Sequence, residues 1–240
     1  MKAIGIIPSR YESKRFPGKP LIGLKGKSMI QHVYERTVDS KLFDEVIVAT
    51  DDQRIFNHVQ SFGGNVEMTS KNHLTGTDRC GEVVKRKRFS DDSIIVNIQG
   101  DEPLVDKRQL ELLLNTFKGS SVTIATLGTK NISPSELSSP NRVKVVLDNH
   151  GDAMYFSRSL IPYPLNDVDL NPIKHIGLYA FKCYIFNEII QLAACQVEQK
   201  ESLEQLRWMY FGYKIRVVLT EIETPNIDSP EDVDKVLRLL

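Results

Sequence analysis

Short β-branched runs alternate with helical patterns in the first half of the chain, and this alternation limits the possible folds more than any other feature. Residues 3–7 (AIGII) and 45–51 (EVIVATD) have the composition of strands. Between them, residues 28–40 carry apolar side chains at helical spacing. A strand, a helix and a second strand in this order predict a βαβ unit.

The alternation continues beyond this unit. Residues 52–62 have a helical pattern that should stop at Gly63-Gly64, and residues 65–68 (NVEM) follow as a short strand. Residues 93–99 (SIIVNIQ) are apolar almost to their end, as in a central parallel strand, and a helix is expected over residues 109–117. The first half therefore predicts an open α/β sheet with ligands bound at the carboxyl ends of its strands.

Four polar residues mark where helices should begin. Ser28, followed three residues later by Gln31, predicts a capping box at the first helix. Asp106 is placed to cap the helix that follows the central strand. Near the end of the chain, Ser229 and Pro230 predict a cap and a first helical position, and this last helix should pack on the first lobe.

The pattern changes at about residue 129, where the sequence becomes polar and rich in turn residues. Residues 142–148 and 152–158 have the composition of paired strands, and 175–181 (HIGLYAF) returns to a buried strand. We expect one domain over residues 1–240, with a smaller inserted lobe at about 129–173.

The overall composition excludes several classes of partner. Lys plus Arg and Asp plus Glu both number 31, so no net field draws the chain to nucleic acid or to an anionic membrane. No apolar run reaches the length of a membrane span. The three widely spaced cysteines form no CxxC pair and fit free thiols in a reducing compartment, so a cytoplasmic location is expected.

The loop after the first strand, residues 8–20, concentrates positive charge in this neutral chain. Its cations are Arg10, Lys14, Arg15 and Lys19. The chain has no P-loop and no GxGxxG motif, so side chains would have to bind any anion there. Arg10 and Arg15 can each bind two phosphate oxygens, and a turn at Pro17-Gly18 can fold Lys19 back towards them. A polyphosphate site is predicted, and a solvated basic loop is the alternative.

Nine segments together resemble one known family over nearly the whole chain. In order they are PSRYESKRFPGKPL, DDQRI, TGTDR, NIQGDEPL, NRVKVVLD, YFSR, HIGLYAF, LEQLR and NIDSPEDV. In order and spacing they are similar to the 3-deoxy-manno-octulosonate (KDO) cytidylyltransferases. The resemblance implies an α/β nucleotidyltransferase-type (Rossmann-like) fold, with a central mixed sheet flanked by helices and a smaller dimerisation lobe. It also implies a homodimer.

The resemblance implies a reaction as well as a fold. A CMP unit would pass from CTP to the sugar acid KDO, with release of pyrophosphate, for lipopolysaccharide synthesis. Mg²⁺ would be the cofactor. Lys19, Arg15 and Asp101 are implied as catalytic residues. Asp101 and Asp228 are implied as the metal ligands.

Site residues follow from the matched motifs. The implied nucleotide-binding residues are Arg10, Ser13, Arg15, Lys19, Gly76, Arg79 and Gln99. The implied sugar-binding residues are Gln99, Arg158, His175, Glu204 and Gln205.

Some of these residues are also indicated by the sequence without the resemblance. Asp101 follows a buried strand, at the edge of the sheet where ligands bind, and Gly100 allows close backbone approach to a substrate. Three other residues also have a purely structural interpretation: Asp228 fits a turn, Arg79 fits a helix surface, and His175 fits a strand interior.

Two alternatives remain at this point. The enzyme could activate another sugar acid, such as 8-amino-KDO or a sialic acid, because the nucleotide half of the site would be the same. The chain could also be a nucleotide-binding regulatory protein on the same fold. Retention of the basic loop and of the two aspartates favours an enzyme, and release of pyrophosphate would separate the two classes.

Overall fold

The computed structural model describes residues 1–12, 16–165 and 172–240. These residues fall into two compact units. Unit 1 comprises residues 1–111, 181–190 and 224–240, and unit 2 comprises residues 112–180 and 191–223. The segment expected to form a smaller lobe, 129–173, falls within the sequence bounds of unit 2, and its role in dimerisation stays a prediction.

Unit 1 contains a parallel sheet whose strands follow the order β6-β1-β4-β5. Its strands are β1 (Ala3–Ser9), β4 (Glu45–Thr50), β5 (Val66–Met68) and β6 (Ile94–Asn97). Strands β1 and β4 are joined through helix α1 (Met29–Asp39), so the predicted βαβ unit is confirmed. All four residues of β6 are buried, as expected for a central strand.

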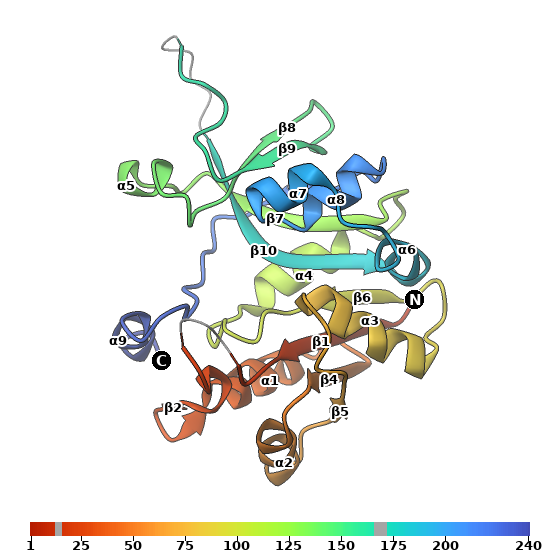
Figure 1. Ribbon diagram of the computed structural model, residues 1–240, viewed down its shortest axis with the longest axis vertical. Helices are drawn as coiled ribbons and strands as arrows, with labels where there is room; N and C mark the ends of the chain where they lie inside the picture. The colour runs from red at the N-terminus through yellow and green to blue at the C-terminus, as the bar shows by residue number, and fades with distance from the viewer. Residues whose placement is uncertain (13–15, 166–171) are drawn as a thin grey trace. The chain divides into compact units, whose positions relative to one another are not determined.

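Helices flank this sheet (Figure 1). They are α1, α2 (Gln53–Ser61), α3 (Gly76–Lys87) and α6 (Cys183–Ile189). The short elements of unit 1 are the 3₁₀ helix η1 (Lys19–Leu21), β2 (Gly23–Leu24) and β3 (Lys27–Ser28). Helix α4 (Lys107–Asn115) begins in unit 1 and ends in unit 2. In the described residues, no helix has both the length and the apolar character that crossing a membrane requires.

The predicted helix caps at Ser28 and Asp106 are confirmed. Of the capping box predicted for Ser28 and Gln31, only one of the two hydrogen bonds forms. The side chain of Ser28 accepts a hydrogen bond from Gln31 N at 3.2 Å, and Asp106 Oδ1 accepts one from Arg108 N at 2.8 Å. The reciprocal half of the capping box at Ser28 does not form, because the Gln31 side chain donates to Glu35 Oε1 one turn later instead. Helix α2 ends at Ser61, just before Gly63 with φ of 77°.

The prediction for the last helix was wrong by two residues. Helix α9 is Asp232–Leu237, so Pro230 precedes it and Ser229 is not its cap. The carboxylate of Asp232 accepts hydrogen bonds from the backbone N–H groups of Asp228 and Ser229, which turns residues 228–231 into a separate bend ahead of the helix.

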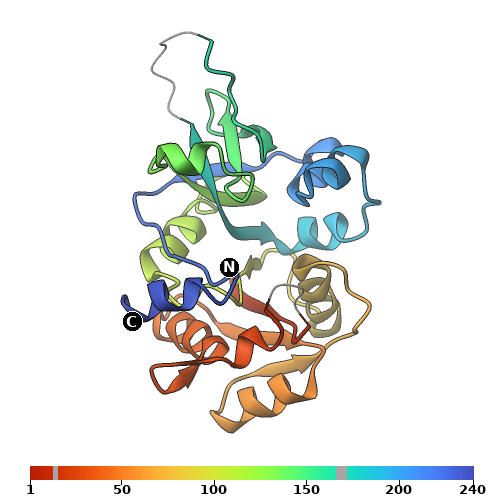
Figure 2. The same ribbon diagram turned by 60° about the vertical axis from the view of Figure 1, so that its left-hand side comes forward.

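Helix α9 packs on the N-terminal part of unit 1, as predicted. Val236 and Ile227 form one buried cluster with Leu24 and Met29. Figure 2 shows the blue C-terminal helix beside the red N-terminal segment. This packing brings residues 224–228 back into the unit that carries the basic loop.

Unit 2 combines parallel and antiparallel pairs, so the fold is α/β with a mixed sheet. Its strands are β7 (Ile124–Thr129), β8 (Lys144–Leu147), β9 (Ala153–Ser157), β10 (Ile173–Lys182, whose last two residues belong to unit 1) and β11 (Arg216–Leu219). The predicted pair β8 and β9 is antiparallel, β8 also pairs antiparallel with β10, and β11 pairs parallel with β7. The unit's helices are α5 (Pro134–Leu137), α7 (Gln196–Glu201) and α8 (Gln205–Tyr210).

Candidate active site

A cavity of about 340 Å³ lies in unit 1 where strands β1 and β6 end. These neighbouring strands are parallel, so their carboxyl ends meet at one edge of the sheet. The predicted residues that line the cavity are Arg10, Lys19, Gly76, Arg79, Gln99, Asp101 and Asp228. Ser13 and Arg15 lie outside the described residues. The structure thus brings together every described nucleotide and metal residue that the sequence nominated.

The turn at Pro17-Gly18 sets the position of Lys19. Gly18 has φ of 72°, a left-handed conformation that glycine adopts without strain, and its N–H donates to Tyr11 O at 2.9 Å. A Cβ at Gly18 would lie 3.1 Å from the Tyr11 ring, so the close packing also favours glycine. The chain then enters η1, which directs Lys19 into the cavity wall.

The Lys19 ammonium contacts both carboxylates of this cavity. Its Nζ donates to Asp101 Oδ2 at 2.8 Å and to the carbonyl oxygen of Ile227 at 2.7 Å, and it lies 3.9 Å from Asp228 Oδ1. The Lys19 side chain is only 13% exposed. One ammonium therefore joins the basic loop to two carboxylates that are far apart in the sequence.

Glu102 is a buried acid that the sequence analysis did not nominate. Burial, and then the charge of Asp101, raise the pKa of Glu102 to about 8, although a hydrogen bond with Thr224 acts in the opposite direction. Among the described residues, its Oε2 atom has no hydrogen-bond partner. Glu102 is therefore mainly protonated at neutral pH. The sequence signal was the second acid of the Asp-Glu pair directly after a buried strand.

The two predicted metal ligands fit Mg²⁺ in their chemistry. Both are carboxylates, and both approach the same ammonium, so this point of the site stabilises positive charge. Mg²⁺ usually takes one or two protein carboxylates and completes its shell with water and substrate phosphates. In the part of the chain that the structure describes, no group of three or more His, Cys, Asp or Glu could hold a metal ion alone. A site completed by substrate oxygens is the arrangement that this donor set allows.

Two glycines on the cavity wall pack against the end of β1. A Cβ at Gly100 would lie 2.8 Å from the carbonyl oxygen of Pro8, and one at Gly76 would lie 3.1 Å from the Pro8 side chain. Gly100 was expected to let a substrate approach the backbone. The structure gives it an additional reason, since the chain's own strand β1 already occupies the space of a side chain there.

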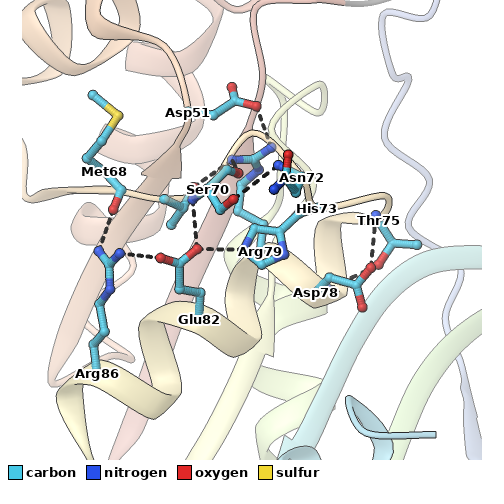
Figure 3. A network of polar contacts seen from close by, with 11 residues as sticks. Asp51, Met68, Ser70, Asn72, His73, Thr75, Asp78, Arg79, Glu82 and Arg86 are labelled. Carbon is cyan, nitrogen blue, oxygen red and sulfur yellow. Dashed lines mark hydrogen bonds and ion pairs between the residues drawn. The ribbon is translucent and has the colours of Figure 1, made fainter. Parts of the chain in front are cut away.

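Arg79 is held by acceptors of the protein itself. Its Nη2 donates to Asp51 Oδ2 at 2.7 Å, and its Nη1 donates to Thr69 Oγ1 at 2.5 Å and to Ser70 O at 3.3 Å (Figure 3). The side chain is 4% exposed, and the residue lines the cavity. The prediction of a nucleotide contact stays open, whereas the structure adds a structural role that the sequence analysis did not foresee.

The sugar-binding candidates other than Gln99 lie in unit 2. All donor nitrogens of the Arg158 guanidinium engage main-chain carbonyls: Nε donates to Glu201, Nη1 to Pro140 and Nη2 to Ser202. Gln205 is buried at the start of α8, directly after Glu204. Arg158 therefore fixes loops of its own unit in this structure.

His175 lies in an aromatic environment on β10. The ring centroids of Phe156 and Tyr179 lie 5.0 and 5.3 Å from that of His175, and its Nε2 lies 3.0 Å from Thr126 Oγ1. Burial lowers the pKa of His175 to about 3, so the imidazole is neutral at pH 7. Burial, and then the charge of Glu204, raise the pKa of Tyr179, although a hydrogen bond with Thr126 acts in the opposite direction. His175, Tyr179 and Glu204 therefore form one local polar group.

Comparisons with known proteins identify the family of this chain. The model of the cytidylyltransferase family matches residues 4–216. The 3-deoxy-manno-octulosonate cytidylyltransferase of Parabacteroides distasonis is 49% identical, with 100% of this chain and 98% of the relative covered. The 8-amino-3,8-dideoxy-manno-octulosonate cytidylyltransferase of Shewanella frigidimarina is 43% identical, with 98% and 97% covered.

A solved structure is similar over the same length. The CMP:2-keto-3-deoxy-manno-octonic acid synthetase complexed with CTP has a TM-score of 0.93 and 45% identity, with 100% of this chain and 98% of that chain covered. The fold, with its cavity at the strand ends, is that of a nucleotidyltransferase-type α/β enzyme. The chain belongs to the cytidylyltransferase family.

Proposed function

We propose that this protein transfers the CMP unit of CTP to 3-deoxy-manno-octulosonate, releases pyrophosphate, and so activates the sugar for lipopolysaccharide synthesis. The observation that carries this proposal is the convergence of Lys19, Asp101 and Asp228 at the cavity where β1 and β6 end. The names of the similar relatives support the choice of nucleotide and sugar acid.

The triphosphate binds on the basic side of the cavity in this proposal. Arg10 and Lys19 line the cavity and supply positive charge to the phosphate oxygens. Ser13 and Arg15, which lie outside the described residues, take part through the resemblance of their motif. Gly76, Arg79 and Gln99 line the same cavity and form the rest of the nucleotide site.

Chemistry takes place at the α-phosphorus. The anomeric hydroxyl oxygen of the sugar acid forms a new P–O bond, the bond between the α-phosphorus and the bridging oxygen to the β-phosphate breaks, and the hydroxyl proton leaves to solvent. Lys19, together with Arg15, stabilises charge on the departing pyrophosphate. Asp101 and Asp228 would hold Mg²⁺, which, when bound, lowers the pKa of the hydroxyl and neutralises phosphate charge. Asp101 also fixes the Lys19 ammonium at 2.8 Å.

In unit 2, the residues proposed to bind the sugar acid are Arg158, His175, Glu204 and Gln205. A neutral His175 can donate or accept one hydrogen bond with a hydroxyl, and Glu204 can accept others. Arg158 is the candidate partner for the sugar's carboxylate. To bind it, the guanidinium would have to exchange at least one of its carbonyl partners at Pro140, Glu201 or Ser202.

8-Amino-3,8-dideoxy-manno-octulosonate is the second candidate substrate. The observation that favours it is the 43% identity, over nearly the full length, to a relative named for this sugar. The nucleotide half of the reaction would be unchanged.

We propose that the reaction takes place in the cytoplasm and that the enzyme is a homodimer. Three buried cysteines in the free thiol state, Cys80, Cys183 and Cys195, are typical of a reducing compartment. The expected dimerisation segment, 129–173, carries exposed apolar side chains in its described part. Examples are Met154, Tyr163 and Leu165, which are 61%, 79% and 76% exposed.

Release of pyrophosphate tests this proposal. The protein is incubated with Mg²⁺ and each of CTP, UTP, ATP and GTP, against a panel of KDO, 8-amino-KDO and a sialic acid. We expect release with CTP and KDO above all other pairs. Greater kcat/KM for 8-amino-KDO would select the second candidate. Binding of CTP without pyrophosphate release with any sugar acid would reject the enzyme and favour a regulatory protein.

A further inference from the structure

One wall of the nucleotide cavity is a segment without regular secondary structure. The wall segment, residues 69–75, connects β5 to α3. His73, Leu74 and Thr75 line the cavity. Leu74 is 86% exposed, so its side chain is available for contact at the cavity. The position of this wall therefore depends on what holds the segment.

Helix α3 holds the wall segment through one face (Figure 3). Arg79, Glu82 and Arg86 are spaced by three and four residues, so their side chains project from the same side of the helix. Arg79 donates to Thr69 and Ser70, and Arg86 Nη1 donates to Met68 O at 2.5 Å. These contacts fasten the beginning of the segment.

Glu82 fastens the part of the segment that approaches the cavity. Its Oε2 accepts a hydrogen bond from Ser70 N at 2.8 Å and lies 2.5 Å from His73 Nε2. Its Oε1 accepts from Arg86. A single carboxylate thus contacts both ends of the turn 70–73 and a guanidinium of its own helix. His73 is the first of the three wall-segment residues that line the cavity.

The helix that carries Glu82 is itself well fixed. Thr75 and Asp78 form a reciprocal capping box at its start, with Asp78 N donating to Thr75 Oγ1 at 3.0 Å and Thr75 N donating to Asp78 Oδ2 at 3.2 Å. The apolar face of α3, which includes Cys80, Val83 and Val84, is buried. The Glu82 carboxylate therefore projects from a well-packed helix towards a segment that has no regular backbone hydrogen bonding of its own.

The local charges keep this carboxylate ionised. Burial by itself would raise the pKa of Glu82. The hydrogen bonds from Ser70 and His73 and the charge of Arg86 outweigh burial, and the net shift is downwards. The contacts of Glu82 are thus charge-assisted at neutral pH, and such hydrogen bonds are stronger than neutral ones.

We propose that Glu82 is a positioning residue of the CTP site, which holds the wall segment through Ser70 and His73 so that residues 73–75 form a preorganised surface for the nucleotide. The inference rests on the proposed function, because it takes CTP as the ligand of the cavity. Glu82 acts through His73 and the backbone and is not itself a catalytic residue.

This role makes a definite kinetic prediction. A wall that contacts the nucleotide equally before and during the reaction contributes to binding of the ground state and the transition state alike. Its loss therefore raises KM for CTP and leaves kcat nearly unchanged. Removing charge-assisted contacts to one carboxylate corresponds to a rise in KM of about tenfold.

The test uses Glu82→Ala and Glu82→Gln in the full-length protein. We expect KM for CTP to rise about tenfold in Glu82→Ala and less in Glu82→Gln, which keeps one acceptor oxygen. The value of kcat and the KM for the sugar acid should stay within about twofold. Hydrogen exchange of amides 70–75 should be faster in both variants, and thermal unfolding and circular dichroism confirm that the variants fold.

Glu67→Gln is the matched control. Glu67 forms an ion pair at 2.8 Å with Lys87, another residue of α3, and its side chain is 28% exposed, against 19% for Glu82. This variant loses an ion pair of the same helix without touching the wall segment. KM for CTP and exchange of amides 70–75 should therefore equal those of the wild type.

The outcomes separate this inference from the proposed function. If the wild type releases pyrophosphate from CTP but both Glu82 variants keep its KM for CTP, the inference is wrong and the function stands. A fall in kcat at constant KM also overturns it, since the residue would then act on the transition state. If Glu82→Ala does not fold, Glu82→Gln decides. If the wild type neither binds nor uses CTP, the proposed function fails and this inference falls with it.

Discussion

Lys19 of unit 1 and Lys144 of unit 2 show how the same residue type can serve different purposes. In unit 1, the Lys19 ammonium meets two carboxylates and a carbonyl at the edge of a cavity. In unit 2, the fully buried Lys144 donates to the carbonyl oxygens of Ser139, Arg142 and Arg158, at 3.0, 2.6 and 2.6 Å. Both cations are satisfied, but by different kinds of acceptor.

The partners decide what each lysine can do. The carboxylates of Asp101 and Asp228 carry charge and can bind another cation, so the arrangement around Lys19 can change when a ligand enters. The carbonyls around Lys144 carry no net charge and belong to turns that the ammonium ties together. Burial, the largest effect, lowers the pKa of Lys144, which is typical of a cation held by neutral acceptors. Lys19 is therefore suited to catalysis, and Lys144 to stability.

The largest effect is expected at the carboxylates of unit 1. Asp101→Asn or Asp228→Asn keeps the side-chain volume and removes the charge, so the fold should survive. We expect kcat to fall by about 100-fold or more, because each loss removes several kcal/mol of charge stabilisation in the transition state. KM for CTP should change much less. Steady-state pyrophosphate release at saturating Mg²⁺ gives both values.

The double variant is the sharper measurement. If both aspartates serve one ion, Asp101→Asn combined with Asp228→Asn should be little worse than the worse single variant. Multiplicative losses would instead assign them independent roles. Equal activity in EDTA and in Mg²⁺ would remove the metal from the proposed mechanism.

The two lysines themselves provide the next comparison. Lys19→Met should lower kcat/KM for CTP by about 100-fold, since it removes a cation from the proposed phosphate site. Lys144→Met should leave the kinetics nearly unchanged but lower the free energy of unfolding by about 3 kcal/mol, because buried carbonyls lose a charged donor. Urea unfolding and CTP kinetics on both variants make the test. The contrast between the lysines fails if Lys144→Met raises KM for CTP while unfolding as the wild type does.

Local sequence patterns predicted the fold of unit 1 well. The cap at Ser28, the cap at Asp106 and the helix stop before Gly63 depend on neighbours within a few residues, and all three are confirmed. The start of α9 was misplaced because Asp232 reaches back to the backbone N–H groups of residues 228 and 229. Several competing cap residues lie together there, and the sequence pattern does not rank them.

The sequence nominated residues that line the cavity, but it did not predict their contacts with one another. Lys19, Asp101 and Asp228 were nominated from the family motif, whereas the bond from Lys19 to the Ile227 carbonyl depends on the packing of α9 and leaves no local signal. Glu82 was missed for a similar reason. Its acceptor role depends on the path of the wall segment, and a glutamate in a charged helix is usually only a surface residue.

Acid stability should separate the neutral imidazole of His175 from the ion pairs of unit 2. The pKa of His175 is about 3 in the fold, below its ordinary value of 6.5, so the unfolded chain binds the proton first as pH falls. His175 therefore costs nothing above pH 6.5 and reduces stability as pH falls from 6.5 towards 3, by roughly 1.4 kcal/mol per pH unit at most. His175→Asn should flatten this part of a stability–pH curve measured by urea unfolding.

Glu136 provides the control in a different pH window. Burial would raise the pKa of Glu136, but hydrogen bonds from Lys174 and Ser133 hold it at about 2, below the ordinary value of 4.5. Its contribution is present above pH 4.5 and is lost as pH falls from 4.5 towards 2. Glu136→Gln should therefore lower stability by a constant amount above pH 4.5, and it should change the slope of the curve only below pH 4.5. An unchanged slope between pH 6.5 and 4.5 in His175→Asn would mean that the imidazole takes up its proton in the folded state.

The smallest effect on catalysis is expected where unit 2 is proposed to meet a second copy of the chain. The side chains of Met154 and Leu165 are apolar and exposed, and a two-fold interface would bury them. Met154→Lys combined with Leu165→Lys should shift sedimentation at micromolar concentration from dimer to monomer, because each copy brings the same charges to the interface. The residues of the unit 1 cavity are untouched, so KM for CTP should change by less than about twofold. A wild type that sediments as a monomer would reject the dimer, and a large change in KM in the monomeric variant would make the nucleotide site depend on the partner.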